Sequence, residues 1–147
     1  MVLKKALDDL WESGKQDFIL KMFGPVPQPA PYMQVQPEGF RHDELPEILS
    51  DTDVLVAPSV WYETFGFTVL EALSFGVPVI VTDHVGARDV VGQGGLVIPA
   101  GDDAALRQTI ESLDSERLAA MRQAVCRLPI KTWDQFMDEN NTLYEDK

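Results

Sequence analysis

The chain has 147 residues, of which 45% are hydrophobic and 24% are charged, a composition that excludes a disordered or fibrous protein and predicts a globular domain. At this length a core can form without disulfides or metals, and the single cysteine, Cys126, favours a reducing compartment. Twelve basic and twenty-four acidic residues give a net charge of −12, which disfavours binding to nucleic acids and to anionic membrane surfaces.

The sequence shows no signal for membrane insertion or export. No apolar run approaches the eighteen or so residues that a transmembrane helix needs, and the first residues lack the apolar core and cleavage site of a signal peptide. We therefore expect a cytoplasmic protein without a transmembrane segment, folded as a single domain over residues 1–147.

The first third of the chain predicts a helix followed by two short strands. Residues 3–11 carry apolar side chains at helical spacing, and residues 17–23 form an apolar run of strand length. Prolines at every second position from 25 to 31 predict an extended loop, because proline fits neither a helix interior nor a central strand. Residues 32–36 then predict an outer strand, and residues 41–50 predict a helix.

The middle of the chain contains the clearest pattern. Residues 53–58 and 78–83 are nearly continuous runs of apolar and β-branched residues, which predict parallel strands covered on both faces. Residues 68–75 between them have helical composition, and Gly76 follows as a C-terminal stop. Together these segments predict a strand, helix and strand in series.

The last part of the chain continues the alternation. It predicts a short helix over 87–91, a turn over 92–95 and a strand over 96–98. Alternating helices and strands predict the α/β class with a mostly parallel sheet flanked by helices. Three further helices are predicted over residues 102–113, 115–127 and 133–144.

In open α/β sheets, ligands collect outside the carboxyl ends of the strands, where helix N-termini favour phosphate. The segment from Ser59 to Thr68 follows the strand that ends at Pro58 and leads into a helix. Gly66 allows close backbone approach, and the amides of Phe65 to Thr68 should point outward at the helix start. This segment is therefore the candidate anion site.

Two carboxylates, Glu63 in the loop and Glu71 in the expected first helical turn, bracket these amides. Carboxylates accept hydrogen bonds from neighbouring hydroxyls, so the pattern suits a phosphorylated, hydroxyl-rich molecule such as a sugar nucleotide. The spacing equally allows Glu63 to be a solvated loop residue and Glu71 to be an acid that complements the helix dipole.

Four segments carry a resemblance to a known family: Pro58-Ser59, Glu63 to Phe67, Glu71 to Ile80 and Gly94 to Pro99. They resemble the C-terminal half of the family 4, or group 1, glycosyltransferases of the GT-B fold. The resemblance implies a Rossmann-like, doubly wound sheet and a retaining, metal-independent transferase of hexosyl type. It implies a nucleotide-diphosphate sugar as substrate, with no cofactor.

The resemblance also implies roles for the candidate residues. Glu63 would act on the transferred sugar as the catalytic residue, and Glu71 would bind the ribose hydroxyls. Backbone amides would bind the diphosphate or the sugar at Phe65, Gly66, Phe67 and Thr68.

Two parts of the family pattern are missing from this sequence. The strand and loop that usually open this domain, with an arginine and a lysine for the diphosphate, do not precede residue 2. The acceptor-binding N-terminal GT-B domain is absent too, so we expect the chain to be inactive alone and to need that domain or a partner chain for an acceptor that the sequence does not identify. The alternative is a non-catalytic Rossmann-like interaction module that packs against a partner chain.

Other polar residues carry weaker signals. Arg88 and His84 follow a predicted strand and could approach the site. Asp51-Thr52-Asp53 has the Asp-x-Asp form of some metal sites, but it precedes a strand, opposite the ligand-binding edge, so we predict capping or solvation there. No histidine has a second ligand at zinc-site spacing, and we expect no metal site.

Overall fold

The computed structural model describes residues 2–130. Helices and strands alternate along these residues, which confirms the predicted α/β class, while the helix predicted over 133–144 lies outside the described residues. The strands are β1 (Leu20–Phe23), β2 (Met33–Gln36), β3 (Leu55–Ala57), β4 (Val79–Thr82) and β5 (Gly95–Ile98). The α-helices are α1 (Val2–Glu12), α2 (Leu45–Ser50), α3 (Phe67–Ser74), α4 (Asp103–Glu111) and α5 (Ser115–Val125).

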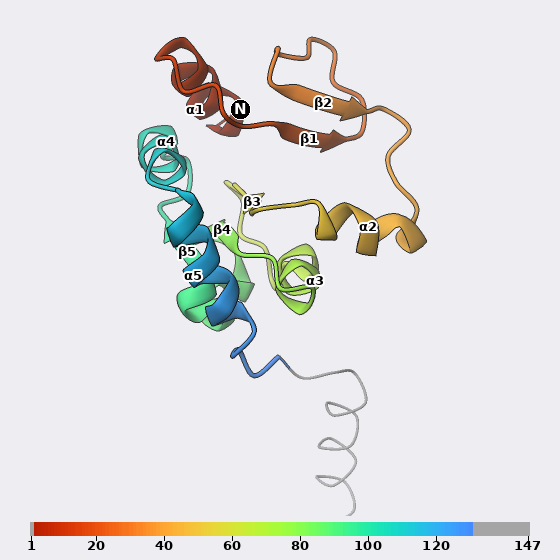
Figure 1. Cartoon of the computed structure of the whole chain (residues 1–147), viewed down its shortest axis with the longest axis vertical. Coiled ribbons are helices and arrows are strands. Elements are labelled where there is room, and N and C mark those ends of the chain that lie inside the picture. Colours follow the sequence, from red (N-terminus) through yellow and green to blue (C-terminus); the bar gives the residue numbers. More distant parts are fainter. Residues whose placement is uncertain (1, 131–147) are drawn as a thin grey trace, which may run out of the picture.

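The strands form two separate parallel sheets (Figure 1). β1 pairs with β2, and the second sheet has the order β3-β4-β5. Three short 3₁₀ turns, η1 (His42–Glu44), η2 (Gly86–Val90) and η3 (Gly92–Gly94), connect the larger elements. Each described strand pairs with its neighbours in parallel, as the sequence predicted, but the sheet is divided between β1 and β3.

Two hydrophobic clusters cover the opposite faces of the second sheet. The side chains of β4 alternate between them: Val79 and Val81 pack with α2, α3 and α5, whereas Ile80 packs with α1 and α4. All four residues of β4 are buried. This strand therefore shows the coverage of both faces that its apolar, β-branched sequence predicted.

Helix α1 spans the two sheets on one face. Its apolar stripe is buried against residues of both sheets and packs beside α4. The hydroxyl of Tyr32, just before β2, donates a hydrogen bond of 2.8 Å to Asp8 Oδ1 of α1. Lys5 pairs with Asp103 at the start of α4. These contacts attach the two-stranded sheet to the rest of the fold.

Strand β3 differs from the expectation for residues 53–58, because its residues are only half-buried. Its hydrogen-bonded neighbour is β4, and its other edge is open. The predicted coverage of both faces is therefore incomplete at β3. Within residues 2–130, none of the helices is long and apolar enough to cross a membrane.

Candidate functional site

The candidate site lies in the loop that leaves the carboxyl end of β3. This loop is hydrogen-bonded to the loop that follows β4: the amide of Glu63 donates to His84 O (2.9 Å), and the amide of Gly86 donates to Glu63 O (3.0 Å). Farther along, the amide of Ala87 donates to Phe65 O (2.6 Å). The two loops thus hold each other at the sheet edge where ligands bind in α/β folds.

Gly66 is the N-cap of α3 and adopts a left-handed conformation, with φ of 86° and ψ of 61°. A Cβ atom at this position would lie 2.8 Å from Val85 Cγ1, so a side chain would clash there as well as strain the backbone. The first amides of a helix have no partner within it, so Phe67 and Thr68 present donors at this end. The turn brings the predicted amides together at one helix N-terminus.

The carboxylate of Glu63 lies beside this helix start. Its Oε2 atom is 3.5 Å from the position that a Cβ of Gly66 would occupy, and its Oε1 atom accepts a hydrogen bond from Ser59 Oγ. The carbonyl oxygen of Ser59 in turn accepts a hydrogen bond of 2.7 Å from Thr82 Oγ1 of β4. A positive dipole end near a carboxylate stabilises its charge. Glu63 is therefore oriented by the loop while it stays exposed to solvent.

Glu71 lies in the second turn of α3, so the expectation of a first-turn acid was wrong. The helix begins at Phe67, four residues earlier, because Gly66 acts as its cap. The helix dipole acts on side chains in the first turn, so it gives no reason for an acid at position 71. A ligand-binding role for Glu71 stays a prediction.

Exposed aromatic side chains surround the helix start. Trp61 and Tyr62 are each 82% exposed, and the rings of Phe65 and Phe67 are 5.1 Å apart. The ring of Tyr62 stacks on His84 at 3.9 Å, from the loop after β4. Tyr62 is not among the predicted site residues. Two consecutive aromatics after a strand were a signal for it, but the stack depends on two loops that meet in space.

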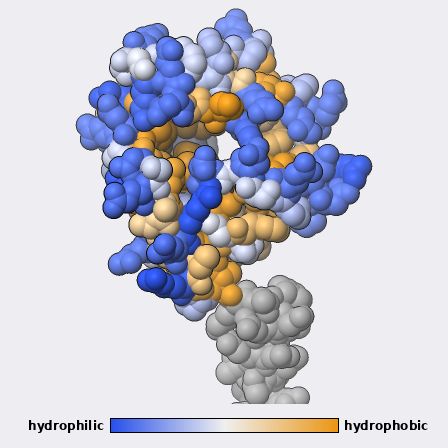
Figure 2. Space-filling view, in the orientation of Figure 1, coloured by the Kyte–Doolittle hydropathy of each residue, from blue (hydrophilic) through white to orange (hydrophobic). Residues whose placement is uncertain are grey.

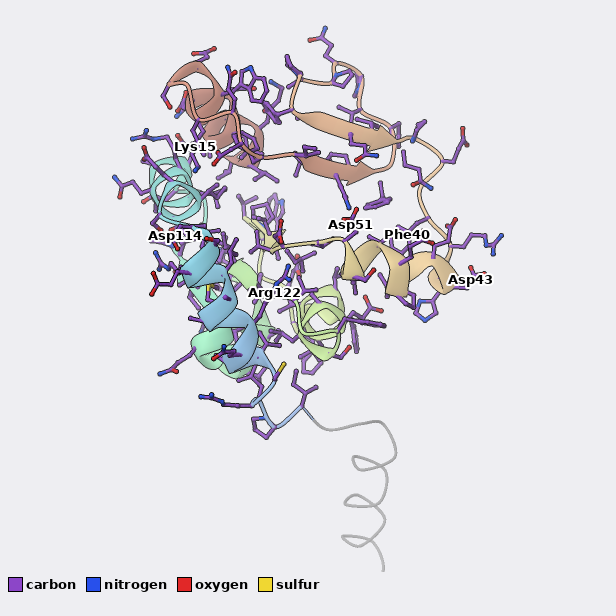
Figure 3. All side chains as sticks on the ribbon, in the orientation of Figure 1. Lys15, Phe40, Asp43, Asp51, Asp114 and Arg122 are labelled. Atoms are coloured by element: carbon purple, nitrogen blue, oxygen red, sulfur yellow. The ribbon has the colours of Figure 1, made fainter. Side chains whose placement is uncertain are left out.

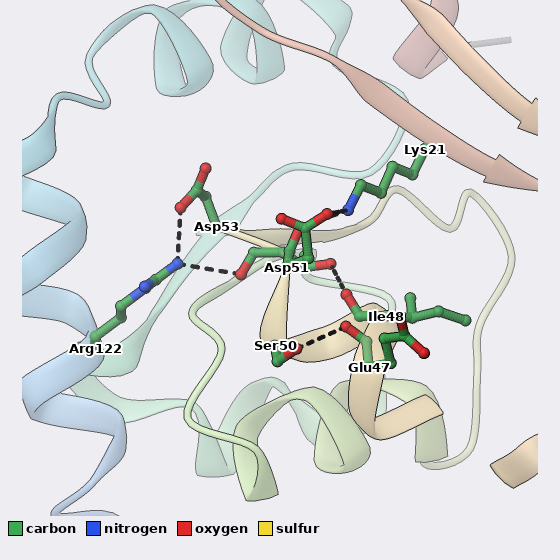
Figure 4. A network of polar contacts seen from close by, with 8 residues as sticks. Lys21, Glu47, Ile48, Ser50, Asp51, Asp53 and Arg122 are labelled. Carbon is green, nitrogen blue, oxygen red and sulfur yellow. Dashed lines mark hydrogen bonds and ion pairs between the residues drawn. The ribbon is translucent and has the colours of Figure 1, made fainter. Parts of the chain in front are cut away.

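The acidic pair before β3 lies at the amino end of that strand. Lys21 of β1 pairs with Asp51, and Arg122 of α5 donates a hydrogen bond of 2.8 Å to Asp53 Oδ1 (Figures 3 and 4). The Nε atom of Arg88, a candidate for the site, lies 3.5 Å from Oδ1 of its neighbour Asp89. Across residues 2–130, no three His, Cys, Asp or Glu side chains come close enough together to hold a metal ion.

Comparison with known sequences gives consistent matches. The sequence model of the family described as "Glycosyl transferases group 1" matches residues 1–116. O-antigen chain mannosyltransferase B of Escherichia coli is 29% identical over 144 residues, which cover 94% of this chain and 34% of that protein. The 2-deoxystreptamine N-acetyl-D-glucosaminyltransferase of Streptomyces fradiae is 43% identical over 67 residues, or 44% of this chain and 16% of that protein. The chain thus spans about a third or less of these relatives.

Solved structures share the fold. A glycosyltransferase from Rickettsia africae superposes with a TM-score of 0.81 at 20% identity, over 99% of this chain and 43% of that one. Anabaena Alr3699/HepE, solved in complex with UDP and glucose, gives a TM-score of 0.62 at 21% identity, over 97% of this chain and 36% of that one. At these identities the likeness concerns the fold alone.

Proposed function

Because the chain belongs to the group 1 glycosyl transferases, we propose that it is the donor-binding part of a retaining, metal-independent glycosyltransferase that uses a nucleotide-diphosphate sugar. The names of its relatives support a hexosyl donor, since they include a mannosyltransferase and an N-acetylglucosaminyltransferase. The solved complexes of Anabaena Alr3699/HepE with UDP and UDP-glucose support a nucleotide donor.

The observation that carries this proposal is the left-handed Gly66 cap at the start of α3. It places the first amides of α3 at the ligand-binding edge of the sheet, beside the carboxylate of Glu63. In the proposal, the amides of Phe65, Gly66, Phe67 and Thr68 bind the diphosphate or sugar.

The two glutamates have separate roles in the proposal. Glu71 accepts hydrogen bonds from the ribose hydroxyls, and Glu63, oriented by Ser59, faces the transferred sugar. In a retaining transfer the nucleoside diphosphate leaves from the face that the acceptor attacks. Catalysis then depends on positioning and on stabilising the charge that develops on the diphosphate, a task that helix-terminal amides perform.

We propose that the chain alone performs no sugar transfer. The chain spans about a third or less of the length of these relatives. In the proposal, an N-terminal GT-B domain or a partner chain supplies the acceptor-binding part of the whole enzyme. In the proposal, the residues of this chain supply the donor-binding groups and none of the acceptor-binding groups. Turnover by the purified chain would contradict this part of the proposal.

Titration calorimetry with UDP, GDP and ADP sugars tests donor binding. We expect one of them to bind and Glu71→Ala to weaken it about 10-fold or more, since it removes a charge-assisted hydrogen bond. Glu116→Ala, in the first turn of α5, is the matched control and should leave affinity unchanged. Absence of binding to a folded sample, or equal affinity of the Glu71 variant, would refute the donor site.

A second pair of variants tests the helix cap. Gly66→Ala places a Cβ 2.8 Å from Val85 Cγ1 and should abolish measurable donor binding. Gly39→Ala is the control. Gly39 also has a positive φ, of 77°, so an alanine there strains the backbone in the same way, but its Cβ would meet nothing within 4 Å. Equal donor affinity in the two variants would show that the geometry at residue 66 does not hold the ligand.

The exposed aromatic residues around α3 favour a second candidate, a non-catalytic module that packs against a partner chain. Trp61 and Phe67 are 82% and 73% exposed, which is typical of a surface that another protein covers. This candidate predicts stable association with a second polypeptide and no response to nucleotide sugars. The calorimetric titration therefore separates the two candidates.

A further inference from the structure

Thr82, the last residue of β4, places a hydroxyl group inside the protein. Hydrophilic residues line the outer rim of the molecule in Figure 2. Among residues 2–130, the buried side chains are apolar except for those of Tyr32 and Thr82, and Thr82 is 1% exposed. Valine has nearly the same shape and would continue the apolar run of β4. Because a buried hydroxyl costs free energy unless it forms a hydrogen bond, the role of Thr82 depends on its partner.

The hydroxyl of Thr82 holds the main chain of the loop that follows β3. It donates a hydrogen bond of 2.7 Å to the carbonyl oxygen of Ser59. The pairing of β3 with β4 ends at Ala57, which lies opposite Val81, so this bond lies just beyond the last paired residues. The side chain of Thr82 thus continues the attachment of the chain to β4 where the pairing of the two strands stops.

Ser59 links this attachment to the carboxylate of Glu63. The Ser59 hydroxyl donates a hydrogen bond to Glu63 Oε1, while Oε2 lies beside Gly66 at the start of α3. Glu63 is exposed, and an exposed glutamate samples several rotamers when nothing holds its carboxylate. Because Thr82 holds the main chain of Ser59, the serine hydroxyl has a fixed base from which to direct that carboxylate. Two successive hydrogen bonds therefore connect buried β4 with the exposed acid.

The loop after β4 holds the main chain of the same segment. The ring atom Nδ1 of His84 lies 3.0 Å from the carbonyl oxygen of Val60. The amide of Glu63 donates to His84 O, and the amide of Gly86 donates to Glu63 O. These three contacts fix the backbone of Glu63, but none of them reaches its carboxylate. The direction of the carboxylate depends instead on Ser59.

We propose that Thr82 is a positioning residue for the sugar end of the donor: its buried hydroxyl fixes Ser59, and Ser59 directs the carboxylate of Glu63 toward the transferred sugar. Thr82 is buried and touches no ligand itself. The inference rests on the proposed donor site for the identity of the ligand. It requires the hydroxyl to affect binding of a nucleotide sugar, whose sugar contacts Glu63, and not binding of the nucleoside diphosphate, which contacts Glu71 and the amides of α3.

Titration calorimetry on the 147-residue chain compares UDP-glucose with UDP, GDP-mannose with GDP, and ADP-glucose with ADP. Thr82→Val removes the hydroxyl and keeps the shape. We expect it to weaken the nucleotide sugar that binds about 3- to 10-fold, at most the worth of one hydrogen bond, and to leave the matching diphosphate within about 2-fold. Thr82→Ser keeps a hydroxyl and should restore the affinity. Thr52→Val is the matched control, since it removes a hydroxyl that donates to Ile48 O at 2.6 Å, before β3, and should change neither affinity.

A double-mutant cycle tests whether Thr82 acts through Glu63. In a chain that already carries Glu63→Gln, adding Thr82→Val should weaken the nucleotide sugar no further, because the group that it positions has been replaced. Additive losses would overturn the proposal, and so would equal weakening of the sugar nucleotide and the diphosphate, which is the result expected of a purely structural residue. If circular dichroism shows that the valine variant is misfolded, Thr82→Ala takes its place in each comparison.

NMR of the glutamate carboxyl carbons tests the positioning without any ligand. Ser59→Ala should shift the Glu63 resonance, because it removes the hydrogen bond to the carboxylate. Thr82→Val should shift it in the same direction, whereas Thr82→Ser and Thr52→Val should leave it in place. An unchanged resonance in Thr82→Val would overturn the inference whether or not a nucleotide binds. A shifted resonance in a chain that binds no nucleotide sugar would refute the donor site and support the link from Thr82 to Glu63, so the two failures are distinguishable.

Discussion

The three-stranded and the two-stranded sheets differ in burial, as β4 and β1 show. In β4 both edges are paired and both faces are covered, and Val79, Ile80 and Val81 are each 0% exposed. In β1 one edge is open, the four residues are half-buried, and neighbouring Ile19 is 71% exposed. Burial here follows the neighbours that a strand acquires as well as its composition, because β1 carries Lys21 whereas β4 has no charged residue.

Strand β3 lies between these extremes. It shares the second sheet with β4, yet its open edge leaves Leu55 to Ala57 only half-buried. If the comparison is correct, substitutions in β4 should cost far more stability than equivalent substitutions in β1, and contacts between the two sheets should contribute smaller increments.

The largest expected change in the free energy of unfolding comes from shortening an apolar side chain in each sheet. Ile80→Ala removes a fully buried side chain and should lower the free energy of unfolding by about 2–5 kcal/mol. Leu20→Ala removes as many carbons from a half-buried position and should cost about 1–2 kcal/mol. Urea denaturation measures both. Equal losses would show that the two sheets are equally well packed in solution.

An intermediate effect is expected at the contact between β2 and α1. Tyr32→Phe removes the hydrogen bond to Asp8 and should cost about 1 kcal/mol near neutral pH. Burial, and then Asp8, raise the pKa of Tyr32 above its ordinary value of 10. The Tyr32 hydroxyl therefore makes its full contribution to the free energy of unfolding below pH 10. This contribution is lost as the pH rises above 10, because the hydroxyl loses its proton in the unfolded chain at a lower pH than in the folded chain.

Urea denaturation between pH 7 and pH 11 measures this difference. The stability gap between the unmodified chain and the Tyr32→Phe variant should narrow above pH 10. Tyr62→Phe, at an 82% exposed position, is the control and should leave the stability near neutral pH unchanged. A gap that widens with pH would mean that the Tyr32 hydroxyl is not held by Asp8.

The smallest expected effect on stability comes from the ion pair between Lys21 of β1 and Asp51. The hydrogen bond from Lys21, and then its charge, lower the pKa of Asp51 below the ordinary value of 3.8. Because the pKa of Asp51 is lower in the folded chain, the ion pair stabilises the fold at pH values above the ordinary pKa. This stabilisation is lost as the pH falls below about 4. The gain is small because the carboxylate is exposed and screened by solvent.

An NMR titration of the carboxyl carbons measures the Asp51 midpoint directly. It should lie below that of an ordinary aspartate and rise in Lys21→Ala. Asp43, whose pKa is lowered by a hydrogen bond from Arg41, should keep its midpoint in that variant. An Asp51 midpoint that does not change in Lys21→Ala would mean that Lys21 of β1 does not pair with Asp51 in solution.

Local sequence signals predicted most of the elements. Asp102 caps α4 by accepting a hydrogen bond of 2.8 Å from the amide of Ala105, and Gly76 follows α3 in a left-handed conformation with a φ of 78°. Caps and glycine stops act within a few residues, so the sequence alone suffices to locate them. Helix α3 begins at Phe67, one residue before the predicted start at Thr68, because Gly66 acts as its N-terminal cap.

The candidate site could be located but not assembled from the sequence. Its position after β3 follows from the order of strand and helix, and Glu63 and Gly66 were identified there. The hydrogen bonds of this loop to residues 84–87 and the stack of Tyr62 on His84 join segments about twenty residues apart. Pairings of this kind depend on how the whole sheet is assembled.

The sequence by itself determined the α/β class, the parallel direction of the strands and the family, because apolar runs, caps and a long motif are written locally in the chain. Only the tertiary structure decided that the sheet is divided between β1 and β3 and that a strand-lined cleft separates the halves. The physical reason is that a strand edge is satisfied or left open by segments distant in sequence, and the pattern of the strand itself does not record which of them are present.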